Sequence, residues 1–431
     1  MDFSLISATS LSIAGRTIWL ILKNWWWLIL PFLLYRHFVF YWHWYKAEKW
    51  DSTVKKVILE IKIPKEIVKP IKAMEQVFSG FHGLHDVFSW REEWWNGEFM
   101  HSISFEMVSI EGKTHFFIRA PEKFRTVIES NIYSQYPEAE ISVVDDYTKS
   151  IPQNIPNKDW DLFGFDMEFT KKSCYPLMTY RYFEESKELV EEKRLDPLAG
   201  FLDGMSMLGP GEHMWLQIVA KPIIGEEPWK EEGRAIVNEL VHREASKTIW
   251  KPIHKEVSDF YIASILPGSE DPKKEEKEII PPEMKLTPGE RDIVKAIEDK
   301  ISKFGFVTFI RFLYLGKKDV FLKPKARIPY GYFKAVSSEA LNGLKPFKET
   351  MPKVQWFFKQ ARTYVRKRVL FRKYSRRFST HFPKPGGTFV LNTEELATLY
   401  HFPGWRVAPA PFVPRVEAKK GEAPAELPVE D

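Results

Sequence analysis

The sequence contains very little cysteine: among 431 residues there is one, Cys174. A single cysteine cannot form an internal disulfide, which excludes disulfide-stabilised scaffolds and zinc sites built from cysteine clusters. Cys174 stands between Lys172 and Pro176 in a strand-like stretch, where we expect a small core residue. This cysteine usage is in keeping with a reducing compartment.

The chain also lacks a large excess of charge of either sign. Lys and Arg total 63 against 58 acidic residues, so the formal net charge is only +5. The positive charge is concentrated in residues 351–393, which hold eleven Lys and Arg and no acidic residue, leaving the remainder of the chain at −6. Any polyanion-binding surface is therefore expected in this segment.

The basic segment alternates aromatic side chains with Lys and Arg, a pattern that suits nucleic-acid backbones or an anionic membrane surface. The candidate polyanion-binding residues are Lys359, Arg362, Arg366, Lys367, Arg368, Arg372, Lys373, Arg376 and Arg377. The alternative is a solvated helix whose apolar side packs on the domain, because Trp356, Phe357, Val365 and Leu370 are spaced as core residues. The sequence leaves both interpretations open.

Sequence motifs of nucleotide hydrolysis are missing. Gly112, Lys113 and Thr114 match the end of a phosphate loop, but Met107 stands where that loop needs a glycine. The residues that follow read as a strand instead of a helix, so we expect a hairpin turn at Glu111 and Gly112.

Other candidate sites favour structural roles. His82 and His85 lie beside glycines that end a helix, without the cysteine or His-Glu-x-x-His partners of a zinc site. Glu212 follows a Gly-Pro-Gly turn and has no second acid or base that the sequence places beside it. We therefore predict no catalytic residue, no cofactor and no metal ligand, and we do not expect an enzyme.

The longest apolar run covers residues 17–44, in which only Lys23 and Arg36 carry full charges. As a helix it would rise about 42 Å, enough to cross a hydrocarbon core of about 30 Å. The run is too long and bulky for a cleaved signal peptide, and its apolar residues surround the axis, unlike those of an interfacial helix. We predict a single membrane-spanning helix here.

The flanking charges predict the orientation of the chain. Only Arg16 precedes the run, whereas Lys46, Lys49, Lys55 and Lys56 follow it, which places the bulk of the chain in the cytoplasm. The expected localisation is the cytoplasmic (inner) membrane, crossed once.

The remaining organisation follows from element order. Residues 54–147 read as strand, helix, strand, strand, helix, strand, which is the ferredoxin-like order. The predicted fold class is α+β: one N-terminal transmembrane helix, two ferredoxin-like (split βαβ) units and a basic helical segment. The predicted divisions are a lead over 1–16, the helix over 17–44, units over 54–147 and 155–345 with a charged linker at 267–285, the basic segment over 351–393, and a disordered tail over 405–431.

Four stretches carry a family resemblance: LEIKIPKEIVKPIKAMEQVFSGFHG, SQYPEAEISVVDDY, the run from DPLAGFL to LQIVAKP, and LNTEELATLYHFP. With the N-terminal apolar run, they make the chain resemble uncharacterised bacterial membrane-anchored proteins. Those proteins are similar to the N-terminal, non-ATPase portion of HerA-like and TraC-like ATPases of type IV secretion and conjugative transfer. The resemblance covers most of residues 17–428.

The resemblance implies a membrane-anchored, non-catalytic scaffold or docking subunit of a DNA or protein translocation machine. The implied partners are a lipid bilayer, a HerA- or TraC-like ATPase, DNA and a second copy of the chain. An alternative is a membrane-tethered nucleic-acid-binding module that delivers DNA to a separate HerA-like ATPase. Because this chain has no phosphate loop, no ATP-hydrolysing residue is carried over.

Overall fold

The computed structural model divides the chain into two compact units. Unit 1 is Met1–Lys56 with Asp86–His101, and unit 2 is Val57–His85 with Ser102–Asp431. The residues described are 16, 19, 23–24, 34–64, 69–184, 196–225, 227–241, 286–355, 357–380 and 387–403. The predicted linker at 267–285 and tail at 405–431 lie outside them.

Unit 1 consists of a helix over residues 34–53 and a loop that contains the π-helix η1, Glu92–Asn96. Gly97 has φ 78°, and a Cβ there would lie 2.5 Å from the carbonyl carbon of Lys46, so the loop passes the helix where only glycine fits. The ring of Trp50 packs on Phe99 and His101, with centroids 5.2 and 4.7 Å away. These aromatic contacts join the loop to the helix.

The fold-class prediction of a membrane-spanning helix must be corrected. In the part of the chain that the structure describes, no helix is both long and apolar enough to cross a bilayer. Half of the range 17–44, where the sequence predicts that helix, lies outside the described residues, namely 17–18, 20–22 and 25–33.

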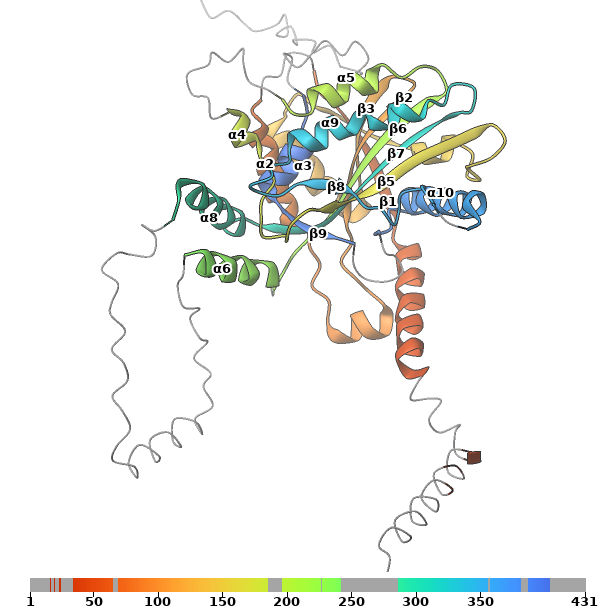
Figure 1. Cartoon of the computed structure of the whole chain (residues 1–431), viewed down its shortest axis with the longest axis horizontal. Helices are drawn as coiled ribbons and strands as arrows, with labels where there is room; N and C mark the ends of the chain where they lie inside the picture. The colour runs from red at the N-terminus through yellow and green to blue at the C-terminus, as the bar shows by residue number, and fades with distance from the viewer. Residues whose placement is uncertain are drawn as a thin grey trace, which may run out of the picture. The chain divides into compact units, whose positions relative to one another are not determined.

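Unit 2 is built on one nine-stranded sheet in the order β4-β1-β3-β2-β6-β7-β5-β8, with β9 also paired to β7 (Figure 1). The strands are β1 Lys56–Lys62, β2 Ile103–Ile110, β3 Lys113–Pro121, β4 Glu140–Val144, β5 Trp160–Phe169, β6 Glu212–Pro222, β7 Gly305–Lys317, β8 Leu344–Pro346 and β9 Phe389–Asn392. The long central strands β6 and β7 are apolar through most of their length and are buried on both faces.

The α-helices of unit 2 are α2 Ile71–His82, α3 Arg125–Gln135, α4 Tyr180–Glu184, α5 Ala199–Ser206, α6 Pro228–Leu240, α8 Pro288–Ile301, α9 Ile328–Ala335, α10 Lys359–Arg376 and α11 Thr393–Leu399. Short 3₁₀ turns are η2 Glu122–Phe124, η3 Tyr147–Ser150 and η6 Lys323–Arg327. Figure 1 places α10 apart from α2, α3, α5 and α9, in keeping with the two different sheet faces that they cover.

The predicted hairpin turn is confirmed. Glu111 and Gly112 have φ 51° and 87°, the left-handed pair typical of a tight two-residue hairpin. The strands on either side, β2 and β3, pair antiparallel from Ser104–Arg119 to Ile110–Lys113. Lys113 and Thr114 therefore belong to a strand and not to a phosphate loop.

The prediction of two ferredoxin-like units is wrong. The elements expected over 54–147 do form in the predicted order, as β1, α2, β2, β3, α3 and β4. However, the second edge of β2 pairs with β6 along its whole length, from Ile103–Ala220 to Ile110–His213. This pairing merges the strands of both predicted units into one sheet, because an unpaired apolar edge would leave its backbone hydrogen-bonding groups unsatisfied.

Each face of the sheet has its own core. On one face, Phe105, Leu216 and Ile310 pack with apolar side chains of α2, α3, α5, α9 and α11. On the other face, Trp215 and Leu313 pack with side chains of α10. The basic helix is therefore the cover of the second face.

Helix α11 is buried along its entire length, so its polar groups must be paired within the protein. Its fully buried Glu395 accepts a hydrogen bond from Lys300 Nζ at 3.0 Å. Just beyond the helix, His401 Nε2 lies 3.0 Å from Asp196 Oδ1, and His401 Nδ1 lies 3.0 Å from the Ala397 carbonyl oxygen.

The His401–Asp196 pair is expected to stabilise the fold less as the pH becomes alkaline. Burial alone would lower the pKa of His401, but the Asp196 carboxylate raises it above the ordinary 6.5. Because the folded pKa is raised, the pair stabilises fully below pH 6.5 and loses that contribution as pH rises through the folded value. We expect the unfolding midpoint of wild type to exceed that of H401Q most below pH 6.5, with a difference that shrinks at alkaline pH. A difference that grows with pH would contradict the charged pair.

Candidate polyanion-binding helix

The basic segment forms α10, whose two halves differ in burial. The C-terminal half buries Leu370, Phe371 and Tyr374 against the sheet. The N-terminal end is exposed: Phe357 and Phe358 are 82% and 83% accessible, and Phe358 has a left-handed φ of 53°. The core-packing interpretation is thus right for Leu370 and wrong for Phe357, while Trp356 lies outside the described residues.

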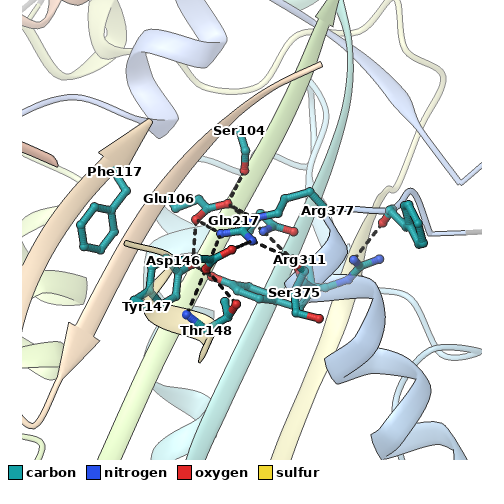
Figure 2. A network of polar contacts seen from close by, with 12 residues as sticks. Ser104, Glu106, Phe117, Asp146, Tyr147, Thr148, Gln217, Arg311, Ser375 and Arg377 are labelled. Carbon is teal, nitrogen blue, oxygen red and sulfur yellow. Dashed lines mark hydrogen bonds and ion pairs between the residues drawn. The ribbon is translucent and has the colours of Figure 1, made fainter. Parts of the chain in front are cut away.

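Beneath the C-terminal end of α10, four polar residues form a row across the sheet, and Figure 2 shows three of them, Glu106, Gln217 and Arg311. Glu106 pairs in register with Gln217, Gln217 with Arg311, and Arg311 with Asp166. All four side chains are fully buried. Arg311 Nε donates to Asp166 Oδ1 at 2.5 Å, which leaves Glu106 as the unneutralised charge of the row.

Arg377, the C-cap of α10, neutralises Glu106. Its Nε and Nη2 donate to the two oxygens of Glu106 at 2.9 and 3.0 Å, and its Nη1 donates to Asp146 Oδ2 at 2.6 Å. The left-handed φ of 58° at Arg377 ends the helix and turns the side chain inward. We call Glu106, Asp146 and Arg377 the Arg377 clamp; it fixes the end of α10 to β2 and to the start of η3.

Hydroxyl groups complete the clamp. Tyr147 Oη donates to Glu106 Oε2 at 2.7 Å and lies 2.8 Å from Tyr374 Oη, while Ser104 Oγ donates to Glu106 Oε1 at 2.6 Å. Burial alone would raise the pKa of Glu106, but Arg377 and these hydroxyl donors lower it to about 2. Glu106 is therefore an ionised structural group at neutral pH.

Three further candidate residues also hold α10 in place. Lys367 Nζ donates to Asp161 Oδ1 at 2.5 Å. Arg366 Nη1 donates to the Met351 carbonyl at 3.0 Å, and Lys373 Nζ donates to the Thr380 carbonyl at 2.5 Å. With Arg377, these residues belong to the packed side of the helix.

The other five candidates, Lys359, Arg362, Arg368, Arg372 and Arg376, are exposed. Arg368, Arg372 and Arg376 follow one another at four-residue spacing, so they share one face of the helix. We call these three the arginine ridge. Arg368 donates to Tyr364 Oη at 3.2 Å, and in the described part of the chain no acidic side chain pairs with Arg368 or Arg372.

A second surface of note lies in unit 1. The outward side of its helix carries Phe38, Tyr41, Trp42 and Tyr45, which are 39–65% exposed and recur at three- and four-residue spacing. The loop adds Trp90, Trp94 and Trp95, 74%, 42% and 63% exposed, and the rings of Trp42 and Trp95 lie 6.4 Å apart. We call these seven side chains the aromatic face.

His82 and Glu212, which the sequence offers as candidate site residues, both contact other groups of the protein. His82 Nε2 lies 3.0 Å from the Ile223 carbonyl oxygen, and the His82 ring stacks on Phe304. Glu212 accepts hydrogen bonds from Tyr314 Oη at 2.6 Å and from Lys325 Nζ at 2.6 Å. Within the described residues, no group of three or more His, Cys, Asp or Glu is arranged to hold a metal ion.

Comparison with known proteins identifies one family. The family model described as "Domain of unknown function (DUF8128)" matches residues 45–408. That range includes all the strands from β1 to β9, together with α10 and the Arg377 clamp. A search of curated proteins finds no match to the chain. Because this family model matches most of the length of the chain, the chain belongs to the DUF8128 family.

Proposed function

We propose that this protein is a membrane-associated docking scaffold, with unit 1 binding the interfacial layer of a lipid bilayer. The observation that carries the proposal is the aromatic face. Trp and Tyr combine a large apolar ring with a polar tip, and they are the residues enriched where membrane meets water. An exposed patch of this composition is costly in water unless it has an occupant.

The surrounding charges support an anionic bilayer as that occupant. Lys46 and Lys49 follow the aromatic positions on the same helix, and Lys46 Nζ lies 5.0 Å from the centre of the Trp42 ring. Basic residues beside an aromatic surface are attracted to the anionic cytoplasmic leaflet. The proposal therefore places the bulk of the chain on the cytoplasmic side of the inner membrane.

The aromatic face can be tested by vesicle flotation of the full chain. We expect simultaneous replacement of Trp90, Trp94 and Trp95 by serine to lower the vesicle-bound fraction at least tenfold, because the three rings supply most of the loop's apolar area. The vesicles should contain phosphatidylglycerol, so that both the aromatic and the basic contributions are present.

A matched control removes exposed apolar side chains from unit 2. Replacing Tyr133, Tyr182 and Met207, which are 40%, 47% and 75% exposed, by serine should leave flotation unchanged. Equal flotation of the Trp variant and wild type would contradict the proposal, since it would show that the aromatic face makes no contribution to binding.

The resemblance to HerA- and TraC-like proteins supports a more specific version of this scaffold. In that version the chain is a docking subunit of a type IV secretion or conjugation-like machine, and unit 2 binds a separate ATPase or a second copy of the chain. Recovery of such an ATPase or of a homo-oligomer on mild purification from membranes is the expected result. A monomer with no bound protein would contradict it.

The arginine ridge favours a second candidate function, a membrane-tethered module that binds nucleic acid and delivers DNA to such an ATPase. Three arginines on one exposed face, with Tyr364 beside them, match the charge and stacking groups of nucleic-acid surfaces. This candidate predicts DNA binding that weakens as salt concentration rises.

A further inference from the structure

A cleft of about 470 Å³ lies beside the loop that leads into α10. Its walls come from Phe163 of β5, from η6 and the first turn of α9, and from Met351 and Lys353 of the loop. The loop is held against the sheet edge, because the Phe347 amide donates to the Asp166 carbonyl at 2.7 Å. Arg366 of α10 donates to the carbonyls of Met351 and Lys353, which joins the cleft to the basic helix.

The charge of this cleft is entirely positive. Lys323, Arg327 and Lys353 line it, and its described lining contains no acidic residue. In the described part of the chain, no ion pair neutralises these three side chains. The third cation of η6, Lys325, is instead paired with Glu212 at 2.6 Å. Of the three cations of η6, Lys325 therefore forms an ion pair within the protein, whereas Lys323 and Arg327 line the cleft.

The remaining lining of the cleft is aromatic and apolar. Phe163 and Tyr330 are both partly exposed, and Lys323 Nζ lies 5.1 Å from the centre of the Phe163 ring. The ring of Phe165 packs against Tyr330 with centroids 5.3 Å apart, which fixes the tyrosine in place. The aromatic rings of the cleft can therefore stack on a base, while the cationic side chains beside them can contact a phosphate at the same site.

We propose that this cationic cleft binds one nucleotide of a single-stranded nucleic acid, with the base against Tyr330 and Phe163 and the phosphate against Arg327 and Lys353. A volume of about 470 Å³ lies in the range of small-molecule sites and accommodates a nucleotide. The hydrogen bond from Arg366 to the Met351 carbonyl fixes one wall of the cleft to α10. The inference rests on the second candidate function, nucleic-acid binding, and specifies the kind of strand.

The test compares two fluorescent probes on the full chain at 100 mM salt: (dT)20 and an abasic 20-mer with the same phosphates. Y330L should lower the affinity for (dT)20 about tenfold and leave that for the abasic strand unchanged, because a stacked base contributes about that factor. R327Q/K353Q should weaken both probes about 25-fold, since each lost phosphate contact reduces affinity about fivefold at this salt. Lys334→Gln, an exposed cation of α9 outside the cleft, is the matched control and should change neither affinity.

A second measurement needs no variant. Photo-crosslinking of wild type to a 5-iodouracil 20-mer should label the peptides that contain Phe163 or Tyr330. Labelling confined to other peptides, or equal affinities of wild type and Y330L for (dT)20, would overturn the cleft while leaving nucleic-acid binding in place. Binding of neither probe by wild type would remove the second candidate function itself.

A lipid headgroup is the other anionic occupant that the test must separate. If R327Q/K353Q abolishes binding to phosphatidylglycerol vesicles but leaves the affinity for (dT)20 unchanged, the cleft holds lipid and the nucleotide proposal is overturned.

Discussion

Replacing Arg377 with alanine is expected to lower the free energy of unfolding of unit 2 by about 3–5 kcal/mol. The side chain is almost fully buried and bonds both oxygens of the fully buried Glu106. Its removal leaves the Glu106 charge without a cation in a site that excludes water, and this uncompensated charge is the main cost. Chemical denaturation of the full chain, followed by circular dichroism, measures the effect.

The neighbouring arginine provides the control. Arg376 differs from Arg377 by one position and is exposed, so R376A should change the unfolding free energy by less than about 0.5 kcal/mol. The double variant E106Q/R377M should be more stable than R377A, because it removes both charges of the pair together. Equal unfolding midpoints for R377A and R376A would contradict the Arg377 clamp.

The stabilisation that the Arg377 clamp provides is expected to be lost at acid pH. The pKa of Glu106 is lowered from 4.5 to about 2 in the folded protein. Because the folded value is depressed, the stabilisation is complete above pH 4.5 and is lost as pH falls from 4.5 towards 2. The difference between wild type and R377A should therefore be largest above pH 4.5 and shrink in acid.

Local patterns in the sequence predict the local structure well. The alternation over 54–64, the hairpin residues Glu111 and Gly112, and the helix periodicities predict six elements of unit 2 in the right order. They do not predict the pairing of β2 with β6, because strands more than 100 residues apart can meet in many registers. Hence the first four strands are identified correctly, but the two-unit architecture is not.

The sequence does contain a signal of the buried polar row, but hydrophobic periodicity alone does not detect it. Glu106, Asp166, Gln217 and Arg311 each stand directly between two apolar residues of a strand. A lone charge in a buried strand requires a partner, yet the sequence cannot say which strand supplies it. The spacing of Leu370, Tyr374 and Arg377 likewise puts Arg377 on the packed side of α10, whereas composition groups it with the surface cations.

Neutralising the arginine ridge is expected to weaken binding of (dT)20 about 100-fold at 100 mM salt. The variant R368Q/R372Q/R376Q removes three exposed charges from one face of α10. Each phosphate contact to a single strand contributes about 0.7 to the slope of log affinity against log salt, so the slope should fall by about 2. Fluorescence anisotropy over a series of salt concentrations gives both quantities.

The three arginines of the ridge are exposed, so their replacement is expected to affect binding more than folding. Arg366, Lys367 and Lys373 bond to the protein itself, so their replacement would loosen α10 as well as change its charge. A control with the same loss of charge replaces Lys318, Lys334 and Lys348, which are exposed elsewhere on unit 2, by glutamine. If the control weakens binding as much as the ridge variant does, the interaction depends on net charge alone, and α10 is not a specific polyanion-binding surface.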